Sequence, residues 1–246
     1  MSARIHPPAR DRFLQAAGQA LVSDGAHFMP AAITRSLLGA TADDLDRFRT
    51  HWERLSPDRY ALARGTRRLR RYGHLSLTTA TTDIRYLRTD TFLQPQDSNP
   101  LYIGTDRRFE PLTDAFTDDP VFMSVLRLLR PMATALDDAA TWDVKVHPFR
   151  VIASADAYGY PAPEGRHRDG VTLVSSLLLH RDNATGGESS VYDVDGAVVL
   201  RTTLRETGDL LVGDDRRTLH DVSPVRPTHP ERPGYRDVLV VTFTPA

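Results

Sequence analysis

The sequence predicts one mainly β domain, residues 1–246, with flanking helices. The chain has 246 residues, of which 40% are hydrophobic, enough for one sizeable core. Its second half contains short runs of β-forming residues separated by turn signals, a pattern typical of a β-sandwich or barrel. No internal repeat or long linker divides the chain. We therefore expect residues 1–140 to supply helices and peripheral strands, and residues 141–246 to supply the β core.

Helices are expected before the β core. Residues 9–23 place apolar side chains at helical spacing, which predicts a helix packed on a sheet. A second helix begins at Thr41, where acidic residues in the first turn complement the helix dipole, and it continues through Trp52 until Ser56-Pro57 ends it. Residues 119–130 predict a third helix.

Strands are expected from residue 74 onwards. Residues 74–93 are rich in threonine and other β-formers and predict one or two strands. Residues 171–179 have the length and apolar content of a strand buried on both faces. Turns are expected at residues 183–188 and at Asp195-Gly196. The remaining strands are expected at residues 144–149, 189–194, 197–203, 208–213, 218–222 and 236–244.

Composition excludes several classes of protein. The formal net charge is −1, so no global field draws the chain to nucleic acid or to an anionic membrane. Cysteine is absent, so any metal site must use histidine and carboxylate. The first ten residues lack the apolar core of a signal peptide, and no apolar run approaches the length of a membrane span. We therefore expect a soluble cytoplasmic protein.

The densest basic cluster comprises Arg64, Arg67, Arg68, Arg70 and Arg71. Clustered cations can bind nucleic acid, but only Tyr72 lies nearby for base stacking. Arginine is also the usual cation of this chain, since Lys145 is the single lysine among 31 basic residues. We therefore expect no nucleic-acid partner. Part of the cluster could instead bind a substrate carboxylate, because a planar guanidinium matches that group.

One segment, residues 163–170, places an imidazole and a carboxylate two positions apart, at His167 and Asp169. If this segment is extended, both side chains point to the same face and can bind one metal ion. His220 can supply a third ligand from elsewhere in the fold. Two histidines and one carboxylate leave other metal positions open, as in non-haem Fe(II) oxygenases. A bare His-x-Asp also arises by chance on solvated surfaces, so the surrounding sequence must decide between the two interpretations.

The surrounding sequence favours the metal site. His220 lies 51 positions after Asp169, and Arg236 lies 16 positions after His220. With this spacing, and with Pro-Glu-Gly-x-His-x-Asp-Gly, Gly-Gly-Glu and His-x-Val-x-Pro-Val around it, the chain resembles the Fe(II)- and 2-oxoglutarate-dependent dioxygenases. Among them it is similar to the bacterial isoleucine-type hydroxylases of free amino acids. The resemblance spans residues 60–246 and includes Gln94, Asn99-Pro100, residues 107–111 and residues 147–150.

The resemblance implies a double-stranded β-helix, the jelly-roll fold of cupins, that works with Fe(II), 2-oxoglutarate and O2. It also implies that His167, Asp169 and His220 bind the iron and that Arg236 binds the far carboxylate of 2-oxoglutarate. The residues themselves agree, because Arg236 shares an otherwise apolar strand face and a cation there needs an anionic partner. One departure is Val238, where several relatives carry a Ser or Thr that also contacts the carboxylate.

The implied reaction is hydroxylation of an unactivated C–H bond in a free L-amino acid or close derivative, with release of succinate and CO2. Related halogenases lack the carboxylate that Asp169 provides, which favours hydroxylation here. Glu164 and Arg150 are candidate substrate contacts or supports for the ligands, and solvent exposure would explain them equally well. Other candidate substrates are a peptide, a carrier-bound residue or another small metabolite. A non-catalytic metal-binding β-barrel is a further alternative, and the sequence predicts no oligomeric state.

Overall fold

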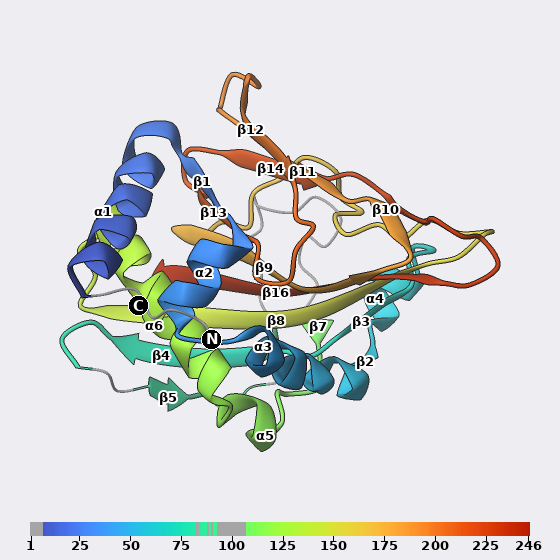
Figure 1. Cartoon of the computed structure of the whole chain (residues 1–246), viewed down its shortest axis with the longest axis horizontal. Coiled ribbons are helices and arrows are strands. Elements are labelled where there is room, and N and C mark those ends of the chain that lie inside the picture. Colours follow the sequence, from blue (N-terminus) through green and yellow to red (C-terminus); the bar gives the residue numbers. More distant parts are fainter. Residues whose placement is uncertain (1–6, 82–83, 88, 90, 93–106) are drawn as a thin grey trace.

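An antiparallel sheet forms the centre of the computed structural model, which describes residues 7–81, 84–87, 89, 91–92 and 107–246 (Figure 1). Neighbouring strands run in the order β1 (Ala26–Met29), β13 (Leu210–Asp214), β9 (Leu173–Asp182), β16 (Gly234–Pro245), β8 (Thr141–Ala153), β3 (Arg68–Arg70) and β2 (Ser56–Pro57). On the same sheet, β4 (Gly73–Thr78) pairs with β8, and β5 (Ile84–Tyr86) pairs with β4. The long pair of β8 and β16 forms the centre of this sheet.

A second layer of shorter strands lies over one face of the main sheet (Figure 1). In this layer β11 (Glu188–Tyr192) lies between β12 (Val198–Thr203) and β14 (Leu219–Val222), and β10 (Ala184–Gly186) pairs with β15 (Val225–Pro227). A further short pair joins β6 (Thr91–Phe92) to β7 (Arg107–Arg108). Residues of both layers line one cavity. The two antiparallel layers confirm the predicted fold class, a mainly β jelly roll with flanking helices.

Helices cover the other face of the main sheet (Figure 1). They are α1 (Pro7–Asp24), α2 (Ala31–Leu38), α3 (Ala42–Arg49), the 3-10 helix η1 (Thr50–Arg54), α5 (Asp114–Thr117) and α6 (Pro120–Leu136). A further short helix, α4 (Arg59–Leu62), lies beside β3 (Figure 1). The largest hydrophobic core lies between α1, α2, α3 and α6 and this face of the sheet. None of the described helices is both long and apolar enough to cross a membrane.

Strand alternation gives the two faces of the main sheet different roles. On β16, Leu239 and Val241 belong to the core beneath the helices, whereas Arg236, Val238 and Val240 line the cavity. On β8 the odd-numbered residues from 145 to 151 line the cavity in the same way. A functional side chain on these strands is therefore directed into the cavity or away from it by its position in the strand.

The predicted helices are present, with shifted ends. Thr41 caps α3 through a capping box, in which its side chain accepts from the backbone N–H of Asp44 and the Asp44 carboxylate accepts in return. The third predicted helix, α6, continues to Leu136 instead of ending at residue 130, although Pro131 lies inside it. The buried residues Leu129 and Met132 flank this proline, so packing against the sheet offsets the missing backbone hydrogen bond.

Several short elements of the main sheet and its surroundings were not predicted. These are the strands β1, β2 and β3 and the helices α2, α4 and α5. β1 and β3 have four and three residues, and they join the sheet only by pairing with β13 and β8, which are distant in sequence. The residues of β3 were predicted only as part of a basic cluster, because two of its three residues are arginine. Gln94 and Asn99, which also carry the family resemblance, lie outside the described residues.

Candidate metal centre

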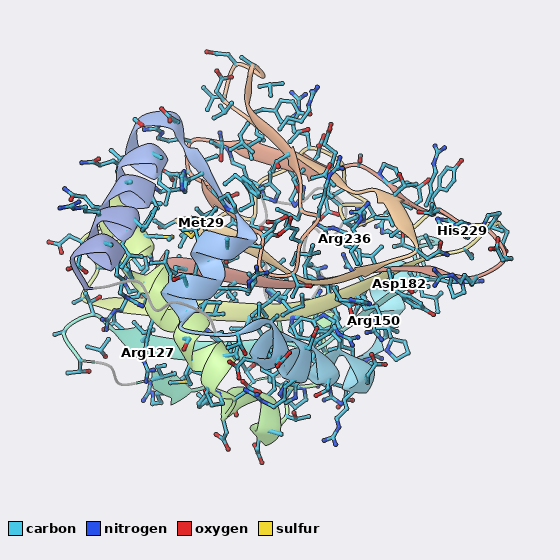
Figure 2. All side chains as sticks on the ribbon, in the orientation of Figure 1. Met29, Arg127, Arg150, Asp182, His229 and Arg236 are labelled. Carbon is cyan, nitrogen blue, oxygen red and sulfur yellow. The ribbon has the colours of Figure 1, made fainter. Side chains whose placement is uncertain are left out.

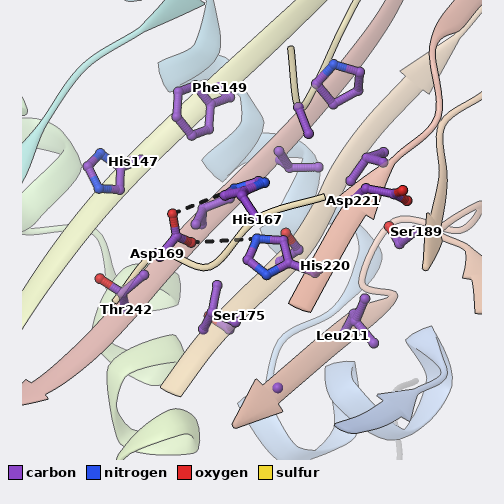
Figure 3. A pocket seen from close by; sticks show the side chains of 18 of the residues that line it. His147, Phe149, His167, Asp169, Ser175, Ser189, Leu211, His220, Asp221 and Thr242 are labelled. Carbon is purple, nitrogen blue, oxygen red and sulfur yellow. Dashed lines mark ion pairs between the residues drawn. The ribbon is translucent and has the colours of Figure 1, made fainter. Parts of the chain in front are cut away.

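A backbone bridge brings the two predicted histidine ligands together at one end of the cavity. His167 lies in the loop between β8 and β9, and His220 lies on β14. The backbone N–H of each residue donates to the carbonyl oxygen of the other, with N···O distances of 3.0 and 2.9 Å. The centroids of the two imidazole rings are 4.4 Å apart. Residues far apart in the sequence therefore present two imidazoles to the same point (Figure 3).

Asp169 completes the group of three ligands. Its Oδ1 lies 3.9 Å from His167 Nε2, and its Oδ2 lies 3.7 Å from His220 Nε2 (Figure 3). One potential ligand atom of each residue lies within 4.8 Å of those of the other two. Two imidazole nitrogens and one carboxylate oxygen are a donor set that suits Fe(II) and leaves further positions open. The arrangement could therefore hold the metal ion expected from the sequence.

Neighbouring acceptors orient the two imidazoles. His167 Nδ1 lies 2.8 Å from the carbonyl oxygen of Gly165, which can only accept. Nδ1 therefore carries the proton, and Nε2 keeps its lone pair for a metal ion. His220 Nδ1 lies 3.5 Å from Asp215 Oδ1, longer than a normal hydrogen bond but close enough for the carboxylate to orient the ring.

Asp215 is a functional residue that the sequence analysis missed. Its carboxylate accepts hydrogen bonds from the backbone N–H groups of Asp169, Gly170 and Val171, with N···O distances of 3.2, 2.7 and 3.1 Å. Asp215 thus ties the segment that carries Asp169 to the turn that precedes His220. The sequence shows only an Asp-Asp pair in a turn, which has no spacing relation to the other ligands, so no local signal could have identified it.

The carboxylates at this centre favour a cation. Burial by itself lowers the pKa of His220, but the carboxylates of Asp215 and Asp169 outweigh it and raise that pKa to about 9. Burial, with Asp215 close by, also raises the pKa of Asp169. Both pKa shifts reflect several carboxylates that lie close together where little water reaches them. A divalent cation bound by these residues would neutralise that negative charge, and its binding would release the proton from His220.

Arg236 lies inside the jelly roll, where β16 faces the cavity (Figure 2). Its side chain is 2% exposed, and its Nε and Nη2 have no hydrogen-bond partner among the described residues. Burial, with Arg181 nearby, lowers the pKa of Arg236 to about 10, so the guanidinium is still charged at neutral pH. A buried cation with unused donors indicates an anion that binds there, and a far carboxylate of 2-oxoglutarate fits.

The two candidate substrate residues lie in different surroundings. Glu164 lines the cavity beside the histidines, and its Oε1 lies 3.5 Å from His167 Nε2. Arg150 lies on the opposite face of β8, where its guanidinium donates to Asp237 at 2.7 and 2.8 Å and to Glu53 at 2.8 and 3.1 Å. Its position as an even-numbered residue of β8 directs it away from the cavity.

The basic cluster is divided between the surface and the cavity. Arg64 and Arg67 are exposed, whereas Arg68 and Arg70 are buried on β3 and line the cavity. Because Arg68 and Arg70 are buried, fewer positive charges of the cluster face the solvent, where a nucleic-acid site would need them. The buried pair also places two guanidinium groups in the same cavity as the metal ligands. Of the two interpretations in the sequence analysis, a contact with a small anion is therefore the one that the geometry favours.

Comparison with protein families identifies the chain. The family model described as 2OG-Fe dioxygenase matches residues 49–242, a range that contains all three candidate ligands and Arg236. The chain belongs to this 2OG-Fe dioxygenase family. The family implies an enzyme that uses Fe(II), 2-oxoglutarate and O2, so the predicted cofactors and the predicted enzyme class are confirmed. The alternative of a non-catalytic metal-binding β-barrel no longer applies.

Two curated relatives are similar to this 2OG-Fe dioxygenase. One is the L-isoleucine-4-hydroxylase of Bacillus thuringiensis, 23% identical over 160 residues, which cover 63% of this chain and 66% of that protein. The other is the 3(1)-hydroxy-L-isoleucine 4-dioxygenase of Pantoea ananatis (strain AJ13355), 23% identical over 165 residues, 65% of this chain and 66% of that protein. The matched part thus spans just under two thirds of each relative.

Solved structures share the fold of this 2OG-Fe dioxygenase over nearly its whole length. A bsmA homolog from Methylobium petroleophilum PM1 is 31% identical with a TM-score of 0.86, covering 95% of this chain and 96% of that one. IDO from Bacillus thuringiensis is 18% identical with a TM-score of 0.76, covering 94% of this chain and 95% of that one. The Fe(II)/(alpha)ketoglutarate-dependent dioxygenase TqaL is 19% identical with a TM-score of 0.76, covering 98% and 91%. The last two likenesses support the fold alone.

Proposed function

We propose that this 2OG-Fe dioxygenase hydroxylates an unactivated C–H bond of a free L-amino acid or a close derivative. One observation carries the proposal: a single cavity contains both the His167, Asp169 and His220 group and the buried guanidinium of Arg236. The curated relatives, which are named for oxidation of isoleucine or hydroxyisoleucine, support the class of substrate. The near-neutral chain offers no global field for a polymer substrate.

In this proposal each residue of the cavity has a separate task. His167, Asp169 and His220 hold the iron, and Asp215 keeps Asp169 and His220 in position. Arg236 binds the far carboxylate of 2-oxoglutarate through charge-assisted hydrogen bonds. Fe(II), when bound with 2-oxoglutarate and O2, supplies an oxidation in which one oxygen atom enters succinate and the other enters the substrate, with loss of CO2.

The protein itself would orient the C–H bond and exclude water. Val174, Val191, Leu211, Val238 and Val240 give the cavity an apolar wall formed by both layers of the jelly roll. An aliphatic side chain fits such a wall because its burial removes apolar surface from water. The carboxylate of Glu164, beside the metal ligands, is a candidate acceptor for the substrate ammonium group. Since Arg150 points away from the cavity, its proposed contact with substrate has no support from the geometry.

A substrate screen tests the proposed function. The purified enzyme is incubated with Fe(II), ascorbate, 2-oxoglutarate and each proteinogenic amino acid in turn, starting with leucine, isoleucine, valine and methionine. We expect one or more of them to increase succinate formation and to gain one oxygen atom by mass spectrometry. If no free amino acid does so while a peptide, a carrier-bound residue or another metabolite does, the substrate assignment is wrong and the enzyme class remains.

A spectroscopic titration tests the use of 2-oxoglutarate without any substrate. Adding 2-oxoglutarate to the anaerobic Fe(II) protein should produce a weak visible charge-transfer band, because the cosubstrate chelates the iron. The His220→Ala variant is the matched control and should give no band. A wild-type protein that binds iron but shows no band would contradict the proposed binding of 2-oxoglutarate at this centre.

A further inference from the structure

A second group of buried cations lines the cavity at β3. The side chains of Arg68 and Arg70 are almost fully buried, and the carboxylate of Asp58, also buried, lies between them. Arg68 donates to Asp58 Oδ2 from Nε at 3.0 Å and from Nη2 at 2.8 Å, while Arg70 Nη1 lies 3.9 Å from the same oxygen. Two guanidinium groups thus share one carboxylate. The group carries a net positive charge in a place with little water, which is unfavourable until an anion binds.

Arg70 is held in place by groups that do not neutralise it. Its guanidinium carbon lies 3.6 Å from the ring centroid of Phe109 and 4.6 Å from that of Phe149. Aromatic faces orient a guanidinium by contact with its flat side. They leave its N–H donors, which lie in the guanidinium plane, available for hydrogen bonds. The Nε of Arg70 is buried without a hydrogen-bond partner among the described residues. A fixed cation with an unused donor is a suitable partner for a carboxylate.

His147 adds a second donor beside Arg70. Its Nδ1 lies 2.6 Å from Arg70 Nη2, which can only donate, so Nδ1 accepts. Burial, with the charge of Arg70 next to it, holds the pKa of His147 well below its usual range, so the ring is neutral. A neutral ring that accepts at Nδ1 carries its proton on Nε2. His147 lies on the cavity face of β8, as Figure 3 shows together with Phe149.

This cation group is separate from Arg236. β8 lies between β16, which carries Arg236, and β3, which carries Arg70. Two strand spacings of about 4.8 Å place the backbones of β16 and β3 about 10 Å apart. The cavity therefore has two separate groups of cations, one on each side of β8. The proposed function assigns a role only to Arg236.

We propose that Arg70 and His147 bind the free carboxylate of the substrate, with Arg68 and Asp58 holding Arg70 in position. This proposal rests on the proposed function, because it names how the substrate of that reaction is held. It also defines the substrate class further: a free acid fits the site, whereas a residue inside a peptide or bound to a carrier through its carboxyl group has no anion to offer. Binding at one end would hold the rest of the molecule near the metal ligands.

The test compares an acid with its amide in matched variants. The wild-type enzyme, Arg70→Gln, Arg70→Lys and the control Arg67→Gln are studied with L-isoleucine and L-isoleucinamide as the first pair, followed by the acid found in the screen. Arg67 is exposed just before β3 and does not line the cavity. Turnover gives KM for each compound, and calorimetry on the anaerobic enzyme with Fe(II) and 2-oxoglutarate gives binding without turnover.

We expect the wild-type enzyme to prefer the acid, and Arg70→Gln to raise KM for the acid by about tenfold to a hundredfold, as for loss of a hydrogen bond to a charged group. The 2-oxoglutarate requirement of this variant should be unchanged. Arg67→Gln should resemble the wild type, and Arg70→Lys should keep part of the preference for acid because it keeps the charge.

Several results would overturn the proposal. One is equal binding of acid and amide by the wild-type enzyme. This comparison needs no variant, so it tests the proposal even if the Arg70 variants do not fold. Another is an Arg70→Gln variant with a raised 2-oxoglutarate requirement and an unchanged KM for the acid, since Arg70 would then serve the cosubstrate. If the enzyme instead oxidises a carboxylic acid that is not an amino acid, and does so in an Arg70-dependent way, the proposed function fails while the carboxylate site stands.

Discussion

At the scale of single residues, two buried arginines of the cavity differ in their partners. Arg70 is near Asp58 and His147, whereas the Nε and Nη2 of Arg236 have no hydrogen-bond partner among the described residues. An unpaired buried cation is unfavourable, and burial accordingly lowers the pKa of Arg236. Binding of a dicarboxylate would remove this penalty. The affinity for 2-oxoglutarate should therefore depend more on Arg236 than on the residues of the apolar wall.

Replacement of Arg236 by Gln should raise the 2-oxoglutarate requirement. Loss of a hydrogen bond to a charged group corresponds to about 1.5–3 kcal/mol, or roughly tenfold to a hundredfold in affinity. KM for the substrate should change much less. The measurement is succinate formation against 2-oxoglutarate concentration, with Arg201→Gln as the control, because Arg201 is more than half exposed and pairs with Glu188. An unaltered requirement in Arg236→Gln would assign the carboxylate to another cation.

The metal ligands and their support should respond to substitution in a graded way. We expect His167→Ala, Asp169→Ala and His220→Ala each to abolish succinate formation, because a centre with three protein ligands tolerates no missing one. Asp215→Asn should weaken iron binding by about 10- to 100-fold, as substitutions beside a ligand typically do. Equilibrium binding of Fe(II) under anaerobic conditions gives both results. Near wild-type turnover in any alanine variant would show that the centre is misassigned.

At the scale of elements, the pairing of β10 with β15 depends on a glycine. Gly186 has a φ of 74°, and a Cβ atom there would lie 2.1 Å from the backbone oxygen of Pro224. The next residue, Gly187, packs against the side chain of Arg236, because a Cβ atom at this position would lie 3.3 Å from Arg236 Cδ. This strand pair therefore supports the wall behind Arg236, and only glycine allows its close approach.

Gly186→Ala should lower the free energy of unfolding more than a glycine substitution whose only cost is a strained backbone conformation. The control is Gly39→Ala, with a φ of 66° and no atom within 4 Å of the added Cβ. A left-handed backbone costs about 1–2 kcal/mol in the control, and the contact with Pro224 adds to this in Gly186→Ala. Chemical denaturation gives both free energies of unfolding. Equal losses in the two variants would mean that β10 and β15 separate without a penalty.

At the scale of the whole molecule, both halves of the chain contribute to one sheet. The strands β1, β3 and β4 come from the first half, and they pair with β13 and β8 from the second. The indole Nε1 of Trp52 in η1 donates to the carbonyl oxygen of Phe149 on β8 at 2.9 Å. We therefore infer that the chain unfolds as one cooperative unit, which is the usual behaviour of a single domain such as the sequence predicts.

The two tryptophans allow a direct test of this cooperativity. Trp52 lies in the helical half and Trp142 is the second residue of β8, and both are fully buried. In each of the variants Trp52→Phe and Trp142→Phe, unfolding in urea is followed by fluorescence of the remaining tryptophan and by far-ultraviolet circular dichroism. The two curves should coincide within each variant. Separate midpoints would show two independently folding parts.

Sequence and structure agree best where a pattern is local. His167 and Asp169 lie two positions apart, so an extended segment directs both to one face whatever surrounds it. Arg236 was predicted to face inwards because it shares one strand face with apolar residues such as Val238 and Val240, and it lines the cavity with them. The main strands and the helices α1, α3 and α6 followed in the same way from the pattern of their apolar residues.

The sequence by itself therefore determined the fold class, and it identified the candidate ligands and Arg236 as the candidate arginine for the cosubstrate. Tertiary structure alone decided that Arg150 faces away from the cavity while Arg70 faces into it. Both faces of β8 are buried, so residue type along the strand does not show which face borders the cavity. Asp215 and Asp58 meet their partners only through packing of separate segments, because burial makes an unpaired charge unfavourable and the fold must bring a partner to it.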